Sequence, residues 1–147
     1  MKVECHPLKT DHLGALCEIA ETTLVPVWSD TEYGYFLNHP SSFNLGLFET
    51  DSGRSLLSFV LALRTEGELD IVSLACHRKS QRQGLGSLLL DELLSRAQCS
   101  RAVLEVDMTN EAAVKLYLKK NFKVVGKRKN YYQQSRDAWV MAWSAVT

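Results

Sequence analysis

The stretch that decides the fold is Gln81-Arg82-Gln83-Gly84-Leu85-Gly86-Ser87, between the apolar segment Glu68–Cys76 and the leucine-rich segment Leu85–Gln98. Two glycines two residues apart let a backbone approach a ligand closely. The first turn of a following helix presents unpaired N–H groups at the positive end of its dipole. The stretch therefore predicts a phosphate cradle. A glycine-rich turn without a ligand is the alternative.

Two other nucleotide-binding loops do not fit this stretch. A Walker loop ends in Gly-Lys-Ser/Thr, whereas Gly86 is followed by Ser87 and Leu88. A dinucleotide fingerprint has a third glycine, and Leu89 occupies that position. Both readings are excluded.

Hydrophobic periodicity and turn residues predict the elements around the loop. Helices are expected from an N-cap at Thr10, between Ser29 and Pro40, and over 85–98 and 110–120, where Asn121 suits the left-handed position that ends a helix. Strands are expected over 2–8, 43–49, 55–64, 68–76, 102–106, 122–125 and 138–143. The order β-α-α-β-β-β-α-β-α-β-β predicts an α/β fold, a mixed sheet with helices covering its faces. No Gly/Ser-rich or Pro-rich linker divides the chain, so residues 1–147 are expected to form a single domain.

Composition narrows the class of protein. The 147 residues are 46% hydrophobic and 23% charged, with a formal net charge of zero. This argues against disorder and against nucleic-acid binding driven by overall positive charge. No apolar run approaches the roughly 18–20 residues of a membrane span, and the first residues do not resemble a signal peptide, so a cytoplasmic protein is expected. The scattered cysteines and histidines lack metal-site spacing, and we expect no metal.

The neutral total conceals an asymmetry. Residues 1–53 contain eight acidic residues but only Lys2 and Lys9, whereas residues 115–136 contain eight basic residues and no acid. One interpretation is a pair of solvated surfaces. The other is a basic region for an anionic cofactor and an acidic region for a cationic substrate. The sequence leaves both open.

A second motif lies downstream of the loop. It runs Leu104-Glu105-Val106-Asp107-Met108-Thr109-Asn110-Glu111-Ala112-Ala113-Val114-Lys115-Leu116-Tyr117, then Asn121-Phe122 and later Asn130-Tyr131-Tyr132. Together with Gln81-x-x-Gly84-x-Gly86, this block resembles the GCN5-related N-acetyltransferase (GNAT) superfamily. It is similar in particular to the RimI-type branch, which acetylates the N-terminus of a ribosomal protein. The resemblance spans Leu69 to Trp143.

The resemblance implies a GNAT fold with a central mixed sheet of about seven strands and helices on both faces. It implies acetyl-CoA as co-substrate, held in a crevice where two parallel strands splay apart. The implied contacts are the backbone of Leu74, Ala75 and Cys76, the phosphate-binding Arg82, Gln83, Gly84, Leu85, Gly86 and Ser87, and Asn110 on the next helix. The alternative for Asn110 is an ordinary N-cap.

Two residues are candidates for proton transfer. Tyr117 lies two helical turns after Asn110, so both face one side of the helix; its hydroxyl could protonate a leaving thiolate, or its ring could simply pack in the core. Glu105 interrupts an apolar strand and shares a face with Val103 and Asp107. The RimI-type pattern places its general base at Glu105, although a solvent-facing carboxylate is the commoner case.

The expected reaction is direct acetyl transfer to a protein N-terminal α-amine in a ternary complex, with a ribosomal protein as the expected partner. Acetylation of a lysine or of a small amine such as a polyamine is the alternative, and a non-catalytic acyl-CoA-binding or interaction domain is the third reading. An acyl-enzyme at Cys76 is also conceivable, but a buried thiol is the simpler reading. The first sixty residues, with Trp28-Ser29 the best match, and the segment Tyr131–Arg136 are expected to shape the acceptor pocket.

Overall fold

The computed structural model describes residues 2–24, 27–51, 53–132 and 136–145. Its strands are β1 (Val3–Pro7), β2 (Leu45–Glu49), β3 (Ser55–Thr65), β4 (Glu68–Cys76), β5 (Arg101–Asp107), β6 (Lys123–Tyr132) and β7 (Arg136–Ser144). Its α-helices are α1 (Leu13–Thr23), α2 (Asp30–Leu37), α3 (Leu85–Ala97) and α4 (Glu111–Lys119), with 3₁₀ turns η1 (Thr10–His12) and η2 (Arg78–Ser80). No described helix is long and apolar enough to cross a membrane.

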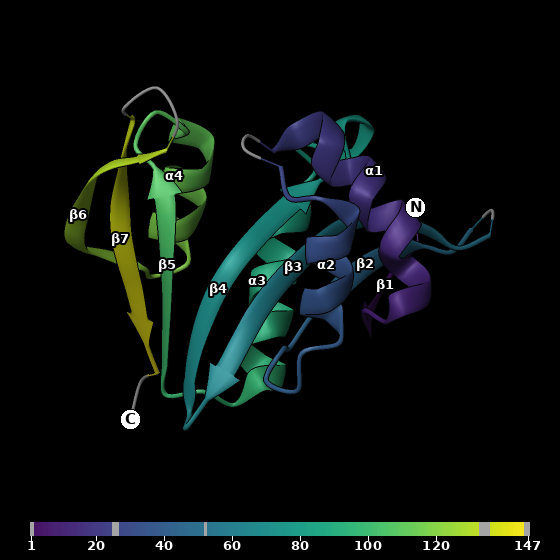
Figure 1. The fold of residues 1–147 in the computed structure, drawn as a ribbon, viewed down its shortest axis with the longest axis horizontal. Coiled ribbons are helices and arrows are strands. Elements are labelled where there is room, and N and C mark those ends of the chain that lie inside the picture. The colour runs from purple at the N-terminus through teal and green to yellow at the C-terminus, as the bar shows by residue number, and fades with distance from the viewer. Residues whose placement is uncertain (1, 25–26, 52, 133–135, 146–147) are drawn as a thin grey trace.

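The strands form one seven-stranded sheet in the order β1-β2-β3-β4-β5-β7-β6 (Figure 1). All neighbouring pairs are antiparallel except β4 and β5, which are parallel. A parallel pair requires a crossover, and η2, the glycine loop and α3 provide it. The predicted mixed α/β fold is confirmed.

Helices cover both faces of the sheet, and each face has its own core. On one face, α3 and α4 pack through leucines, Tyr117 and Phe122 against β2 to β5 and β7. On the other face, α1 and α2 pack against β2 to β4, with Tyr33 and Phe59 at the centre. Figure 1 shows α1 and α2 in front of β2 to β4, while that face of β5, β7 and β6 carries no helix.

Most predicted elements are confirmed within a few residues. Ser29 caps α2 in a reciprocal capping box with Glu32, and Asn121 adopts a left-handed φ of 71°. The predicted N-cap at Thr10 is wrong: Lys9 is the last extended residue, and the 3₁₀ turn η1 intervenes before α1 begins at Leu13. The turn predicted at 51–53 includes residue 52, which lies outside the described residues.

The largest difference concerns β6, which runs to Tyr132 rather than ending at Val125. The extension, Gly126–Tyr132, begins with glycine followed by three basic residues, so apolar alternation does not reveal it. It is a strand because it pairs with β7. At the outer edge of the sheet its charged side chains can remain in solvent.

The parallel strands β4 and β5 pair over only part of their length. Their ladder runs from Glu68↔Arg101 to Ile71↔Leu104, although β4 continues to Cys76 and β5 to Asp107. A bulge at Val72, which has no partner between Ile71↔Ala62 and Ser73↔Leu61, coincides with this divergence. Beyond it, backbone groups of β4 that face β5 are available to a ligand.

Candidate active site

A cavity of about 660 Å³ opens where β4 and β5 diverge. Its walls come from both strands, the end of α1, the start of α2, α4, β6 and β7. Sequence-predicted residues Leu74, Glu105, Asn110 and Tyr117 all line it. The structure therefore brings together side chains from three elements that the motif alone could order only along the chain.

The predicted phosphate loop lies at the N-terminus of α3. Gly84 is the N-cap residue with a left-handed φ of 76°, and Arg82 is also left-handed at 67°. Gln81 turns back on the loop, and its Nε2 donates to the Cys76 carbonyl at 3.3 Å. Arg78 Nε donates to the Thr22 carbonyl at the end of α1 at 2.7 Å. These bonds shape a loop whose residues 81–84 are exposed.

Gly86 joins this loop to the cavity. A Cβ at Gly86 would lie 3.0 Å from Leu116 Cδ2 and 3.9 Å from Leu74 Cδ2, and both leucines line the cavity. The predicted loop residues Arg82 to Ser87, Gly86 included, are not among the cavity-lining residues, and neither are Ala75 and Cys76. Leu85 is buried in the core, so only its backbone can face a ligand. The arrangement suits a long donor with phosphates at the loop and a thioester between the strands.

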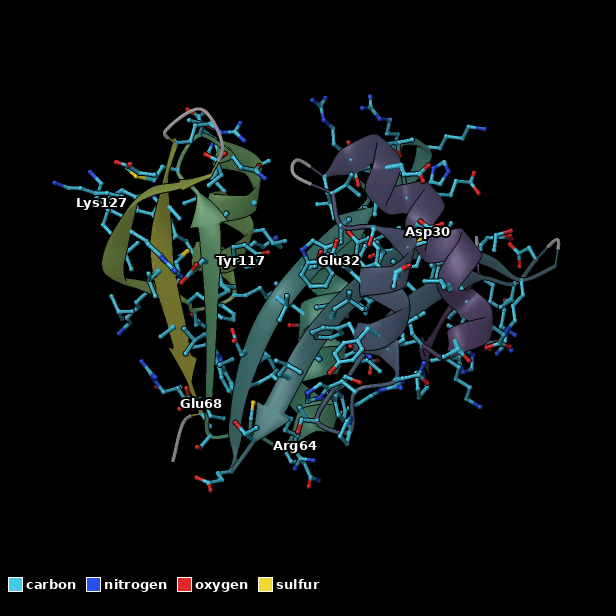
Figure 2. The ribbon with its side chains drawn as sticks, viewed as in Figure 1. Asp30, Glu32, Arg64, Glu68, Tyr117 and Lys127 are labelled. Carbon is cyan, nitrogen blue, oxygen red and sulfur yellow. The ribbon has the colours of Figure 1, made fainter. Side chains whose placement is uncertain are left out.

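Asn110 is the N-cap of α4, and its Oδ1 accepts a hydrogen bond from the Ala113 N–H at 3.2 Å. The prediction of an ordinary N-cap at Asn110 is thus confirmed. A contact between Asn110 and a cofactor would occur in addition to this capping bond. Tyr117 is only 7% exposed and packs edge-on against Phe122, with ring centroids 5.7 Å apart. Figure 2 shows Tyr117 beside β5, on the side toward β4. The core-packing reading of Tyr117 is therefore also correct, and its cavity position makes chemistry possible as well.

Three carboxylates line the cavity, and two of them pair with arginines. Arg128 Nη1 on β6 donates to both oxygens of Glu105, at 2.8 and 3.1 Å. Arg136 Nε on β7 lies 3.0 Å from Asp107 Oδ2. Glu105 and Asp107 share one strand face, as alternation predicts, and Glu105 retains 26% of its side-chain exposure. Glu105 is therefore a partly solvated carboxylate held by an ion pair.

Asp70 on β4 is the third carboxylate, and the sequence reading missed it. Among the described residues, no cationic side chain pairs with it. Partial burial raises the pKa of Asp70, and the charges of Glu105 and Glu68 raise it further. The alternation of polar and apolar residues in Glu68-Leu69-Asp70-Ile71 could have indicated that Asp70 faces away from the core. Its proximity to Glu105, however, depends on the parallel pairing of β4 with β5.

Cys76 lies at the end of β4, with its Sγ 3.5 Å from the Ser58 hydroxyl. Burial raises the pKa of this thiol above its ordinary value. A raised pKa reduces the thiolate fraction, which is the nucleophilic form. The geometry thus favours a structural thiol over an acyl-enzyme.

Two predicted acceptor-site features have different outcomes. Trp28 lines the cavity with the end of α1. Of Tyr131–Arg136, residues 133–135 and the side chains of Tyr131 and Tyr132 lie outside the described residues, as does the side chain of Asn130.

Comparison with known proteins agrees with this architecture. The chain is 31% identical over 142 residues to the [ribosomal protein bS18]-alanine N-acetyltransferase of Salmonella typhimurium, covering 92% of this chain and 93% of that protein. It is 27% identical over 126 residues to an N-alpha-acetyltransferase of Saccharolobus solfataricus, covering 75% of each. The crystal structure of the ribosomal-protein-S18-alanine N-acetyltransferase from Escherichia coli superposes with a TM-score of 0.92 at 25% identity, covering 99% of this chain and 96% of that one.

The divergent strand pair, the loop before α3 and these relatives define an N-acetyltransferase. A sequence model of the acetyltransferase (GNAT) family matches residues 13–122. The chain belongs to that family.

Proposed function

We propose that this protein transfers an acetyl group from acetyl-CoA to the α-amine at the N-terminus of a polypeptide. The observation that carries the proposal is the placement of Glu105 and Tyr117 in one cavity between the divergent strands. The similarity to N-alpha-acetyltransferases over most of the chain supports the choice of an α-amine. We propose that residues 1–147 form a single N-acetyltransferase domain.

The donor half of the site faces α3 and α4. The N–H groups at the start of α3 and the loop Arg82–Ser87 would bind the pyrophosphate, because helix N-termini favour anions. The backbone of Leu74 to Cys76 would bond to the pantetheine as an extra strand would. Asn110, whose Oδ1 is used in capping α4, would contact the cofactor through the rest of its amide.

The acceptor half faces the other side of the sheet. Leu104 and Val106 belong to the core beneath α3 and α4, so alternation turns Glu105 to the opposite face. An α-amine has a pKa near 8 and must lose a proton before it attacks a thioester. Glu105 would accept this proton, directly or through water.

Attack forms the C–N bond and breaks the C–S bond, and the electron pair leaves with sulfur. Tyr117, on α4 at the opposite wall of the cavity, would protonate the departing thiolate. Backbone N–H groups near Cys76 would stabilise the oxyanion. Direct transfer in a ternary complex follows, since Cys76 is poorly suited to hold the acyl group.

The acceptor we propose is the N-terminus of a ribosomal protein in the cytoplasm, because two compared relatives bear that substrate in their names. The alternatives from the sequence are a lysine side chain and a polyamine. The decisive experiment offers acetyl-CoA with ribosomal-protein N-terminal peptides, N-blocked lysine peptides and spermidine, and follows thiol release. Thiol release with spermidine alone contradicts the proposal, and so does the absence of release with every acceptor.

The proposed proton transfers give the first mutational prediction. We expect Glu105→Gln and Tyr117→Phe each to lower kcat about 100-fold, since positioned general acids and bases contribute at least this much. Steady-state thiol release with the preferred peptide measures kcat, and calorimetric titration measures acetyl-CoA binding. An unchanged kcat for Tyr117→Phe, with donor binding intact, would remove the assigned acid.

A further inference from the structure

A second hollow, outside the catalytic cavity, lies on α2. It measures about 390 Å³ and is lined by Trp28, Thr31, Glu32, Tyr35 and Phe36. Tyr35 is 75% exposed, and neighbouring Val27 is 42% exposed. One aromatic ring and one aliphatic side chain thus stand at the surface beside a depression, where a partner could bury them.

Trp28 connects this hollow, the α2 hollow, to the catalytic cavity, because it lines both. Its ring is held by Tyr33 at 5.1 Å and Phe36 at 5.7 Å between centroids. Tyr33 is 1% exposed and belongs to the core, so the Trp28 ring packs against a buried side chain. A chain that leaves the catalytic cavity past Trp28 would meet a preformed aromatic surface.

One charged side chain lines the α2 hollow, the acidic Glu32, and Asp30 lies elsewhere on the same helix. In Figure 2, Glu32 lies on the side of α2 toward Tyr117, and Asp30 lies toward α1. The segment 10–53, which contains both helices, has no lysine or arginine at all. The surface therefore complements a cationic chain with an apolar side chain.

We propose that the α2 hollow binds the acceptor polypeptide beyond its acetylated end. An apolar or aromatic side chain of the acceptor occupies the hollow against Trp28 and Tyr35, and a basic side chain lies near Glu32. The inference rests on the proposed function, because it assigns the rest of the same substrate. It makes the enzyme selective for downstream sequence as well as for the terminal residue.

The test compares three acceptors with the same first two residues: a dipeptide amide, a peptide continuing with apolar and basic residues, and one continuing with Gly and Ser. For the wild type we expect the apolar-basic peptide to have a KM about tenfold lower than the Gly/Ser peptide, since buried aromatic anchors dominate binding. In Tyr35→Ala this KM advantage is lost and kcat is retained. Tyr35→Phe keeps most of it.

Leu118→Ala is the matched control. Leu118 is an apolar side chain, 50% exposed, on α4 and outside both cavities. This variant should behave as the wild type with all three acceptors.

Three outcomes would overturn the inference: equal wild-type KM values for the two longer peptides, a Tyr35→Ala effect that extends equally to the dipeptide amide, or sedimentation showing that Tyr35→Ala dissociates a dimer. The last would assign the α2 hollow to a second copy of the chain. Failure of the proposed function is distinct, because no acceptor, including the dipeptide amide, would then release thiol.

Discussion

At the scale of single residues, the active-site carboxylates differ in their partners more than in their chemistry. Glu105 pairs with Arg128, Asp107 pairs with Arg136, and Asp70 has no cationic partner among the described residues. Arg128 reaches Glu105 across β7, where the residue opposite Arg128 is Ala138. A methyl group at that position leaves room for the arginine. The two hydrogen bonds from Arg128 Nη1 engage both oxygens of the Glu105 carboxylate, so we expect Arg128 to orient it.

We expect Arg128→Gln to lower kcat about tenfold, because small displacements of a reacting group are costly. The KM for acetyl-CoA should not change, since Arg128 lies on the acceptor face. Arg128→Lys should recover part of the rate. The measurement is steady-state kinetics with the donor and the acceptor varied separately. A rise in donor KM with constant kcat would contradict this positioning role.

For Cys76, in contrast, we expect substitution to leave kcat nearly unchanged. Because burial raises its thiol pKa and a hydroxyl contacts its sulfur, Cys76→Ser should keep kcat within about twofold. Mass spectrometry of the wild type mixed with acetyl-CoA alone should detect no acetylated cysteine. A trapped acetyl group on Cys76, with loss of activity in the serine variant, would establish a two-step mechanism instead.

At the scale of elements, the loop before α3 depends on a residue that tolerates left-handed backbone. Gly84 has a φ of 76°, and a Cβ there would meet no atom within 4 Å. Its constraint is conformational and not steric. The start of α3, where we propose that the pyrophosphate binds, is therefore positioned by backbone geometry at the N-cap.

We expect Gly84→Ala to lower the free energy of unfolding by about 1 kcal/mol and to raise the KM for acetyl-CoA, because left-handed φ is unfavourable for alanine. Gly84→Asn is the matched control and should cost less, since asparagine visits this region more readily. Chemical denaturation and donor titration measure the two effects. Equal losses for both variants would show that space, and not φ, limits the position.

At the scale of the whole molecule, the active site lies where the two halves of the sheet diverge. β2 to β4 carry helices on both faces, and β5 and β7 carry α4 on one face only (Figure 1). Asp70, Glu105 and Asp107 line the cavity at this divergence together. Carboxylates gathered in this way oppose folding unless cations or protons offset them.

This repulsion predicts a pH-dependent stability effect for Asp70→Asn. The pKa of Asp70 is raised in the folded state, so the folded state binds the proton more tightly than the unfolded chain. Ionised Asp70 thus opposes folding at neutral pH, and this cost disappears as pH falls through the raised pKa. We expect Asp70→Asn to stabilise the protein at pH 7 by at most about 1 kcal/mol, since the side chain is partly exposed.

The same variant should give no gain below the ordinary carboxyl pKa of 3.8, where Asp70 is neutral in both states. Thermal unfolding of both proteins from pH 3 to pH 8 measures the difference. A constant difference across this range would exclude the electrostatic cause.

The sequence by itself determined the order of helices and strands, the α/β class, the capping of α2 by Ser29 and the glycine loop before α3. These features depend on neighbouring residues, through side-chain periodicity and backbone preference. It also named Glu105 and Tyr117 through a motif, but could not say that both line one cavity. It missed the length of β6, because edge strands tolerate charge.

Only the tertiary structure decided the partners of the carboxylates. The Arg128–Glu105 pair depends on β7 lying between β5 and β6, the place of Asp70 depends on the parallel pairing of β4 with β5, and the continuity through Trp28 depends on α2 packing over the sheet. The physical reason is that such contacts join residues far apart in the chain. Their distances follow from sheet order and packing, which no local pattern specifies.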